Sequence, residues 1–154
     1  MKPLFALIII VLFFGCSKSD NDTANPSTLT KTALLTSKDW VMTSKQIKKV
    51  TDASWTDDFS GKSTCEKDDR IVFTTIGTYE FNEGASRCSP SDPFIIETGT
   101  WKFAQNETLI VITKTGSTTI MDATIETLNS TTLLLSYVER FLGVEYNIKQ
   151  GYGH

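Results

Sequence analysis

The fold is decided by the stretch Ile71-Val72-Phe73-Thr74-Thr75-Ile76-Gly77-Thr78-Tyr79-Glu80-Phe81. A three-residue turn at 75–77, with Gly77 in the left-handed conformation of a bulge turn, makes this stretch a β-hairpin. Phe73 then faces Tyr79 and Ile71 faces Phe81, so all four large apolar groups share one side. A two-residue turn would instead pair Phe73 with Glu80 and would not place these groups on one side. Because a slip of one residue moves every side chain to the opposite face, we predict the three-residue turn.

Strand signals continue on both sides of this hairpin. Segments rich in Thr, Ile, Val and aromatic residues predict eight strands, close enough in sequence to pair as antiparallel neighbours. We place them at 40–50, 70–74, 78–82, 97–104, 108–114, 118–128, 131–138 and 143–149. Before the first strand, residues 32–38 predict one or two helical turns with Leu34 and Leu35 as the apolar contact.

The connections between these strands differ in length. Tight turns at 75–77, 105–107 and 129–130 contrast with about 19 residues after the first strand and about 14 after the third. In an up-and-down meander, odd-numbered connections lie at one end and even-numbered ones at the other. Cys65 and Cys88 lie in the two long loops and are therefore expected at the same end. Closure into an all-β, eight-stranded antiparallel barrel removes the exposed edges, and we predict that fold.

The N-terminus carries a separate signal. Lys2 precedes an apolar run of about 11 residues at 4–14, too short to span a bilayer, and Gly15-Cys16 and polar residues follow. This arrangement resembles the lipobox of bacterial lipoproteins, where cleavage precedes a cysteine that carries a diacylglycerol. The resemblance implies a signal peptide at 1–15 and lipidation of Cys16. The small, polar, Pro-containing residues that follow predict a flexible tether at 16–30. A buried N-terminal helix with an incidental cysteine is the alternative.

Location and charge follow from this interpretation. By resemblance to lipoprotein sorting, Ser17 after Cys16 favours the outer membrane, at its periplasmic face or the cell surface. In the tether, Asp22-Thr23-Ala24 resembles the O-glycosylation sequence used by Bacteroidota. Removal of residues 1–15 leaves 14 basic and 18 acidic side chains, a net charge of −4. The remainder has the size of one domain, placed at 31–154, and it has no basic face for nucleic acid.

Two cysteines remain after lipidation of Cys16. In an exported, oxidising compartment Cys65 and Cys88 predict a disulfide, worth roughly 3 kcal/mol by the loop-entropy estimate. A metal pair is the alternative, but zinc needs further Cys or His ligands and the lone histidine is His154 at the C-terminus. The carboxylates at 57–58 and 66–69 leave a loop calcium site conceivable, although solvated loop charge is commoner.

Several residues follow one another in a recognisable order: Leu34-Leu35-x4-Trp40, Cys65-x2-Asp68-Asp69-x3-Phe73-x3-Gly77-Thr78-Tyr79, Cys88 and Gly99-Thr100-Trp101. This combination resembles the lipocalin-like lipoproteins of Bacteroidota. It covers about residues 30–150. The resemblance implies a lipocalin-type barrel on a lipid anchor, commonly without an assigned ligand.

An eight-stranded barrel is just wide enough to be filled by side chains or to hold one small ligand. We expect these residues to face inward: Trp40, Ile71, Phe73, Tyr79, Phe81, Trp101, Phe103, Leu133, Leu135 and Tyr137. Filling of the barrel is the simpler expectation, and a partial cavity is the alternative. The strand at 118–128 lacks clear alternation, so its facing stays open.

Catalytic machinery is nearly absent from the sequence. A lone C-terminal histidine makes a His-based triad improbable, and no Gly-rich phosphate-binding motif is present, so we expect no enzyme and no cofactor. Trp55 and Phe59 need burial although they lie in a polar loop, so they either plug the barrel mouth or contact a ligand or partner. The candidate ligand-binding residues are Trp55, Phe59, Arg87, Phe94, Trp101, Tyr137 and Phe141.

These observations predict a lipid-anchored envelope protein that binds a small, mostly apolar ligand at the open rim. The alternative is a filled barrel that presents its loops to another envelope protein. A cavity of about 300 Å³ or more favours the ligand, whereas packed aromatics with an exposed apolar rim favour the partner.

Overall fold

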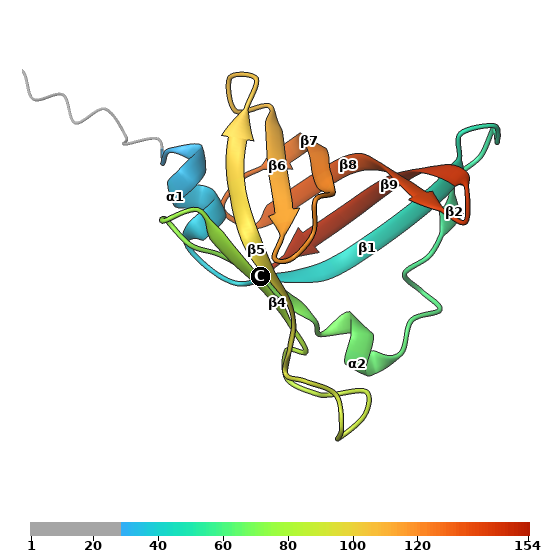
Figure 1. The fold of residues 1–154 in the computed structure, drawn as a ribbon, viewed down its shortest axis with the longest axis horizontal. Helices are drawn as coiled ribbons and strands as arrows, with labels where there is room; N and C mark the ends of the chain where they lie inside the picture. Colours follow the sequence, from blue (N-terminus) through green and yellow to red (C-terminus); the bar gives the residue numbers. More distant parts are fainter. Residues whose placement is uncertain (1–28) are drawn as a thin grey trace, which may run out of the picture.

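A computed structural model describes residues 29–154. The predicted signal peptide, the lipidation site Cys16, the residue Thr23 and nearly all of the predicted tether lie outside the described residues. The described chain forms an antiparallel β-barrel with two short helices (Figure 1). Within 29–154, the helices are too short and too polar to cross a membrane.

Eight strands form the barrel, as predicted. The elements in chain order are α1 (Lys31–Thr36), β1 (Trp40–Lys49), β2 (Thr56–Asp57), α2 (Thr64–Lys67), β3 (Arg70–Phe73), β4 (Thr78–Asn82), β5 (Ile95–Ala104), β6 (Leu109–Lys114), β7 (Ile120–Leu128), β8 (Thr132–Phe141) and β9 (Val144–Gly153). Consecutive strands from β3 to β9 pair antiparallel, and β1 pairs with both β3 and β9 to close the barrel. The two-residue β2, which the sequence did not predict, pairs with the far half of β1.

The β3–β4 hairpin has the predicted register. Phe73 pairs with Tyr79 and Ile71 with Phe81. Gly77 has a φ of 82°, the left-handed region that favours glycine. Its carbonyl accepts a hydrogen bond from the Trp101 N–H at 2.8 Å, so the turn is also tied to β5. The three-residue bulge turn is therefore confirmed.

The last two strands are longer than predicted. Residues 139–142 were expected to form a loop, but pairing of β8 with β9 continues to Phe141 and Val144. Leu142 and Gly143 have φ values of 48° and 81°, typical of a two-residue hairpin turn. At the other end β9 continues to Gly153, beyond the predicted boundary at 149. Gly151 permits this, because a Cβ there would come 2.4 Å from the Ser44 hydroxyl oxygen on β1.

Side chains fill the end of the barrel that carries the tight turns and α1, which we call the packed end. Leu35 and Trp40 are fully buried there, and the Trp40 indole N–H donates to the Leu35 carbonyl at 2.8 Å. Trp101 packs edge-on against Phe73 and Phe103, with ring centroids 5.7 and 5.2 Å apart. All of the predicted inward residues belong to this core or pack against it.

β7 also faces the core in a regular way. Ala123 is fully buried, and Met121 and Ile125, two residues away on either side, pack against the core cluster. The facing that the sequence left open is therefore settled by alternation along this strand.

The opposite end, which we call the open end, carries the long β1–β3 and β4–β5 loops. A disulfide joins Cys65 and Cys88 there, with their Cα atoms 5.2 Å apart, and the prediction of this bond is confirmed. The β4–β5 loop and the part of the β1–β3 loop that contains α2 lie toward the bottom of Figure 1, whereas the β5–β6 turn of the packed end lies at the top. The parity argument for a meander therefore gives the correct placement of both cysteines.

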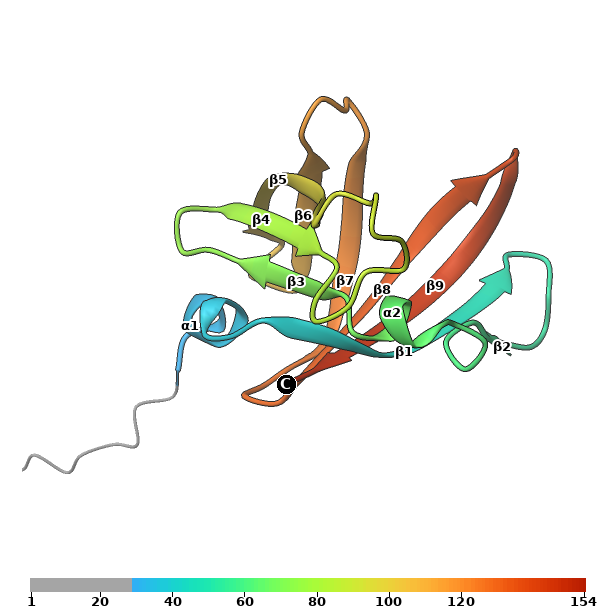
Figure 2. The same cartoon turned by 90° about the horizontal axis from the view of Figure 1, so that it is seen from below.

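The barrel wall parts toward the open end. Pairing between β7 and β8 stops at Thr124 and Ser136, and pairing between β1 and β3 involves only Trp40 and Val41 of β1. Strands β8, β9 and β1 therefore diverge from β3–β7, as Figure 2 shows. We call the gap between residues 120–123 of β7 and 137–141 of β8 the lateral slit.

Candidate functional site

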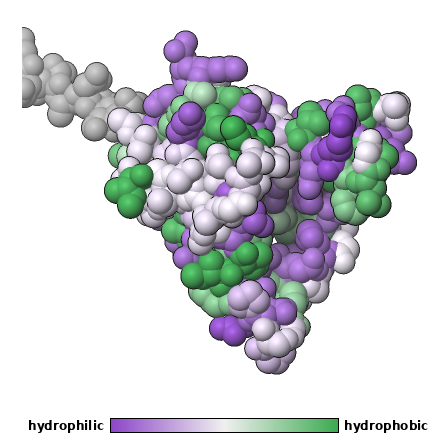
Figure 3. All heavy atoms as spheres, in the orientation of Figure 1, coloured by the Kyte–Doolittle hydropathy of each residue, from purple (hydrophilic) through white to green (hydrophobic). Residues whose placement is uncertain are grey.

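A cavity of about 550 Å³ lies inside the open end of the barrel. We call it the mouth cavity. Figure 3 shows the molecule hollowed between the body with β5 and β6 and the arm formed by β8 and β9. The volume falls within the range of small-molecule sites in proteins. The barrel is thus filled at one end and hollow at the other, a combination of the two expectations.

Apolar side chains from four strands form one wall of the mouth cavity. Ile71 of β3, Ile112 of β6 and Met121 of β7 all line it, and Phe81 of β4 lies beside them. Ile71 and Ile112 are 8% and 6% exposed, so they offer apolar surface directly above the packed end. This wall suits the hydrocarbon part of a ligand.

Polar side chains form the floor. The Tyr137 hydroxyl donates to the Gln150 amide oxygen at 2.7 Å, and the Gln150 amide nitrogen lies 3.6 Å from the Met42 sulfur. Tyr152 lines the same floor and is 8% exposed. Burial raises the pKa of both tyrosines above its ordinary value, so their hydroxyls keep their protons. The floor therefore offers hydrogen-bonding groups without a formal charge.

Three polar side chains contact one another in a row from the cavity to its rim. The Tyr79 hydroxyl donates to a carboxylate oxygen of Glu97, whose other oxygen forms an ion pair with Lys114 at 2.8 Å. Burial, reinforced by the hydrogen bond and the charge of Glu97, raises the pKa of Tyr79. Tyr79 is thus fixed in position as a neutral wall of the site.

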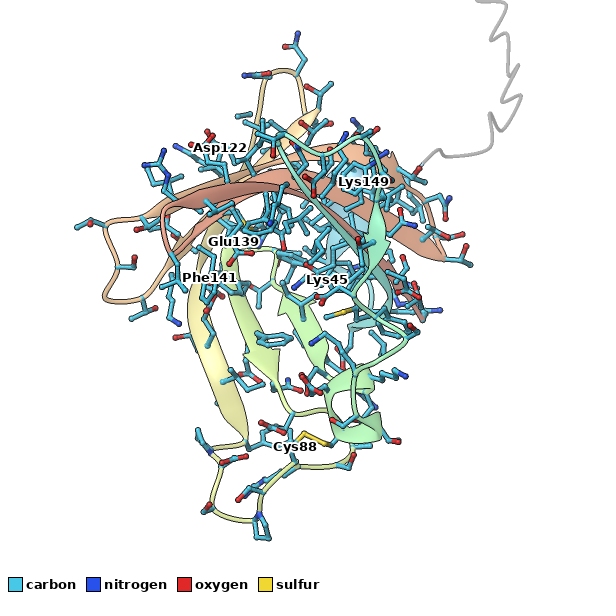
Figure 4. The ribbon with its side chains drawn as sticks, turned by 90° about the vertical axis from the view of Figure 1, so that its right-hand side faces the viewer. Lys45, Cys88, Asp122, Glu139, Phe141 and Lys149 are labelled. Atoms are coloured by element: carbon cyan, nitrogen blue, oxygen red, sulfur yellow. A yellow bond between two sulfur atoms is a disulfide. The ribbon has the colours of Figure 1, made fainter. Side chains whose placement is uncertain are left out.

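Charged groups surround the mouth itself. Lys45 forms an ion pair with Asp58 at 3.2 Å and Lys62 with Glu66 at 3.1 Å. Figure 4 looks into the open end and shows Lys45, Glu139 and Phe141 around the mouth. Within residues 29–154, Glu139 has no cationic group within ion-pair distance.

Asp69 lies deeper at the same end. Burial raises the pKa of Asp69 to about 6, and the negative charges of Glu83, Asp68 and Glu66 add to the effect. Its Oδ1 atom is buried without a hydrogen-bond partner in the described chain. The open end therefore concentrates negative charge, some of it uncompensated.

The structure brings Tyr137, Phe141 and Phe59 to the open end. Tyr137 lines the mouth cavity, and Phe141 lines an adjoining hollow of about 290 Å³ with Tyr146 and Ile148. Phe59 packs against the core, and the Lys67 ammonium lies 5.4 Å from its ring. Phe59 is thus partly buried in the way that the plug hypothesis requires.

The other predicted site residues lie elsewhere. Trp101 is in the packed end and does not line the mouth cavity. Trp55 lies on the outer face of the barrel, where the ammonium groups of Lys48 and Lys149 are each 5.3 Å from its ring centroid. Figure 4 shows Lys149 on this outer side. The expectation that Trp55 reaches the mouth was wrong, because β2 pairs with β1 and holds the loop along the outside.

Arg87 and Phe94 stay together on the β4–β5 loop. The guanidinium carbon of Arg87 is 5.8 Å from the Phe94 ring centroid, and Phe94 is 44% exposed. Neither residue lines the mouth cavity. They belong to the rim of the open end.

Sequence reasoning missed Glu97, Glu139 and Gln150 as site residues. Side chains alternate along β8, so Glu139 faces inward like Leu135 and Tyr137. A correct prediction of where β8 ends would therefore have identified Glu139 as a site residue. Gln150 lay beyond the predicted end of the last strand. In the part of the chain that the structure describes, no group of three or more Cys, His, Asp and Glu side chains is placed to hold a metal ion.

Comparison with known families supports the architecture. A family model described as a lipocalin-like domain matches residues 36–135, which run from the end of α1 into β8. A search of curated proteins finds no match. Since the matched segment covers most of the barrel, the chain belongs to the family of lipocalin-like domains.

Proposed function

We propose that the protein is a lipid-anchored binding protein of the cell envelope that holds a small, largely apolar ligand in the mouth cavity. The observation that carries the proposal is the cavity of about 550 Å³, closed below by the packed end and open above. Apolar walls with a few placed polar groups are the usual composition of small-molecule sites.

The anchor and the location rest on the sequence. Gly15-Cys16 after an apolar run supports lipidation of Cys16, and Ser17 supports the outer membrane. Leu29 leads into α1 at the packed end, opposite the mouth (Figure 1). An anchor at Cys16 therefore joins the barrel at the end away from the mouth, which leaves the cavity accessible to ligand.

A binding role fits the site better than catalysis. The single histidine of the chain, His154, packs against Trp40 at the packed end, with ring centroids 4.0 Å apart. Its Nδ1 lies 2.7 Å from the Asp39 carbonyl oxygen. It does not line the mouth cavity, where hydroxyl, amide and carboxylate groups can form hydrogen bonds that hold and orient a ligand.

The test compares two substitutions on β6. Ile112→Phe fills the mouth cavity, whereas Val111→Phe adds the same ring to the outer face of the same strand. In the mature lipoprotein in detergent, we expect Ile112→Phe to weaken binding of a polarity-sensitive fluorescent dye at least tenfold and Val111→Phe to leave it unchanged. Equal dye binding by the two variants, with both folded by circular dichroism, would exclude the cavity as the site.

A second candidate function is supported by the rim. Phe94, Ile95 and Ile96 are 40–46% exposed in one run, and Leu142 at the β8–β9 turn is 87% exposed. Apolar residues at a rim favour a protein partner. A photo-crosslinker at position 142 in living cells would then give a defined adduct, while one at Ile76, 84% exposed in the packed-end turn, would not. Equal labelling at both positions would count against a partner at the rim.

A further inference from the structure

The cations that line the mouth cavity and the hollows beside it are already engaged in ion pairs. Lys45, Lys62 and Lys114 each form an ion pair with a carboxylate at 2.8–3.2 Å. Glu139 differs, because none of the described cations lies within ion-pair distance of it. Glu139 lines the mouth cavity, the adjoining hollow beside Phe141, and a third hollow of about 610 Å³ that Ile120 and Val138 also line, so it occupies the junction of these three spaces.

The lining of the mouth cavity carries a negative balance. Its carboxylates are Glu66, Asp69, Glu97 and Glu139, and its cations are Lys45 and Lys62. A negatively charged ligand would have to displace an existing carboxylate from Lys45 or Lys62. A positively charged ligand finds an unpaired partner in Glu139. The aromatic rings of Tyr79 and Tyr137 line the same space and also attract cations.

Gln150 gives independent evidence that the cavity receives a polar ligand. Its side chain is nine-tenths buried and lines the cavity floor. The amide oxygen is satisfied by Tyr137, but the amide nitrogen, which has two N–H donors, meets only the Met42 sulfur at 3.6 Å. A thioether is a weak acceptor, so at least one donor lacks an oxygen or nitrogen partner within the described chain. An oxygen atom of a ligand would supply it.

We propose that the mouth cavity selects a positively charged amphiphile: an ammonium group beside Glu139, an apolar body against Ile112 and Met121, and an oxygen acceptor at Gln150. The proposal rests on the proposed binding function. It predicts discrimination by charge, which a purely apolar pocket does not provide.

Three probes with the same eight-carbon chain test the charge. Octylamine, octanol and octanoate displace the fluorescent dye from the mature lipoprotein at neutral pH, below their aggregation concentrations. We expect octylamine to bind at least tenfold more tightly than octanoate, with octanol between them. In Glu139→Gln the advantage of the amine should fall to about threefold or less. Glu107→Gln, the same charge change at the exposed β5–β6 turn, should preserve the full advantage.

A fourth probe tests Gln150. Adding a terminal hydroxyl to octylamine gives 8-aminooctanol. The ratio of the affinity for 8-aminooctanol to the affinity for octylamine should be at least threefold lower in Gln150→Leu than in the wild type. Gln150→Leu keeps a side chain of similar size, so its thermal unfolding temperature reports whether the floor is intact. An unchanged ratio in a folded variant would overturn the role of Gln150.

The outcomes separate the two proposals. If the dye binds and the amine has no advantage over octanoate, the charge selection is wrong while the binding function stands. If neither the dye nor any probe binds, both are wrong. If the amine advantage survives Glu139→Gln unchanged, the assignment of the ammonium position is overturned.

Discussion

The packed end and the open end of this barrel are made from the same strands, yet one excludes water and the other admits a ligand. On β6 the inward residues are Ile110, fully buried in the core, and Ile112, which borders the mouth cavity. On β8 they change from Leu133 and Leu135 to Tyr137. Since side chains alternate along a strand, the chemistry of the interior at each level is fixed by every second residue.

This comparison shows that side chains fill the barrel interior less completely where the pairing between neighbouring strands is lost. Where β7 and β8 pair, up to Thr124 and Ser136, the interior is solid. Where they separate, polar groups replace hydrocarbon and space opens. Continued pairing keeps opposite walls close enough for side chains to meet, and separation leaves a volume that they do not fill.

The largest expected effect is a matched pair of truncations on β6. Ile110→Ala should lower the free energy of unfolding by about 4 kcal/mol, because it leaves a new void in a closed core. Ile112→Ala should cost only about 2 kcal/mol, because it widens a space that already exists. Urea denaturation of both variants measures the difference. Equal costs would mean that the open end is as tightly packed as the other.

Removal of the disulfide should lower the stability of the whole fold and loosen the open end further. Cys65→Ser with Cys88→Ser should lower the free energy of unfolding by about 3 kcal/mol, since the open chain gains conformational entropy when unfolded. Amide hydrogen exchange should speed up at Trp40 and Leu133 only by this loss of global stability, and it should speed up by a larger factor in α2 and the β4–β5 loop. Uniformly faster exchange would show that the bond supports the whole barrel.

A smaller effect is expected at the cavity floor. Tyr137→Phe deletes the hydroxyl that donates to Gln150 and should cost about 1 kcal/mol. Tyr146→Phe on the neighbouring strand is the control, because the Tyr146 hydroxyl has no hydrogen bond within the described chain. Thermal unfolding of the two variants compares them. No difference would mean that the floor hydrogen bond does not stabilise the fold.

The smallest expected effect depends on pH. The pKa of Asp69 is raised to about 6 in the folded protein, so the folded state binds a proton more tightly than the unfolded state. Stability associated with this group should therefore fall as pH rises from about 4 to about 6, and the penalty should be complete above that range. Asp69→Asn should gain unfolding temperature over wild type at pH 7.5 but not at pH 4. Asp92→Asn, in the β4–β5 loop, should show no such difference in unfolding temperature between the two pH values.

Local patterns account for what the sequence predicts well. The register of the Ile71–Phe81 hairpin follows from Gly77 and from the four large apolar residues that must share one face. The alternation of long and short connections placed both cysteines at the same end of the barrel, which is correct. The path of the Trp55 loop was not predictable in this way. It depends on two residues of β2 pairing with Gln46 and Ile47, a contact too short to leave a periodic pattern.

The site was predicted less completely than the fold. Glu139 and Gln150 were missed because the ends of β8 and β9 were placed too early. The Leu142-Gly143 turn signal, with apolar Phe141 and Val144 on either side, marks the true hairpin end. The sequence does not show which inward residues line the cavity. That depends on how far two strands diverge, and the sequence of either strand alone does not determine the distance between them.

The lateral slit has a consequence for self-association. The Ile125 N–H donates to the carbonyl of Thr108, the residue before β6. By alternation, Ile120 and Asp122 therefore turn their backbone donors and acceptors away from β6, into the slit. An exposed strand edge of this kind invites another chain to pair with it. Asp122 places a negative charge in the middle of that edge, so two copies of this acidic protein repel each other where their backbones would otherwise join.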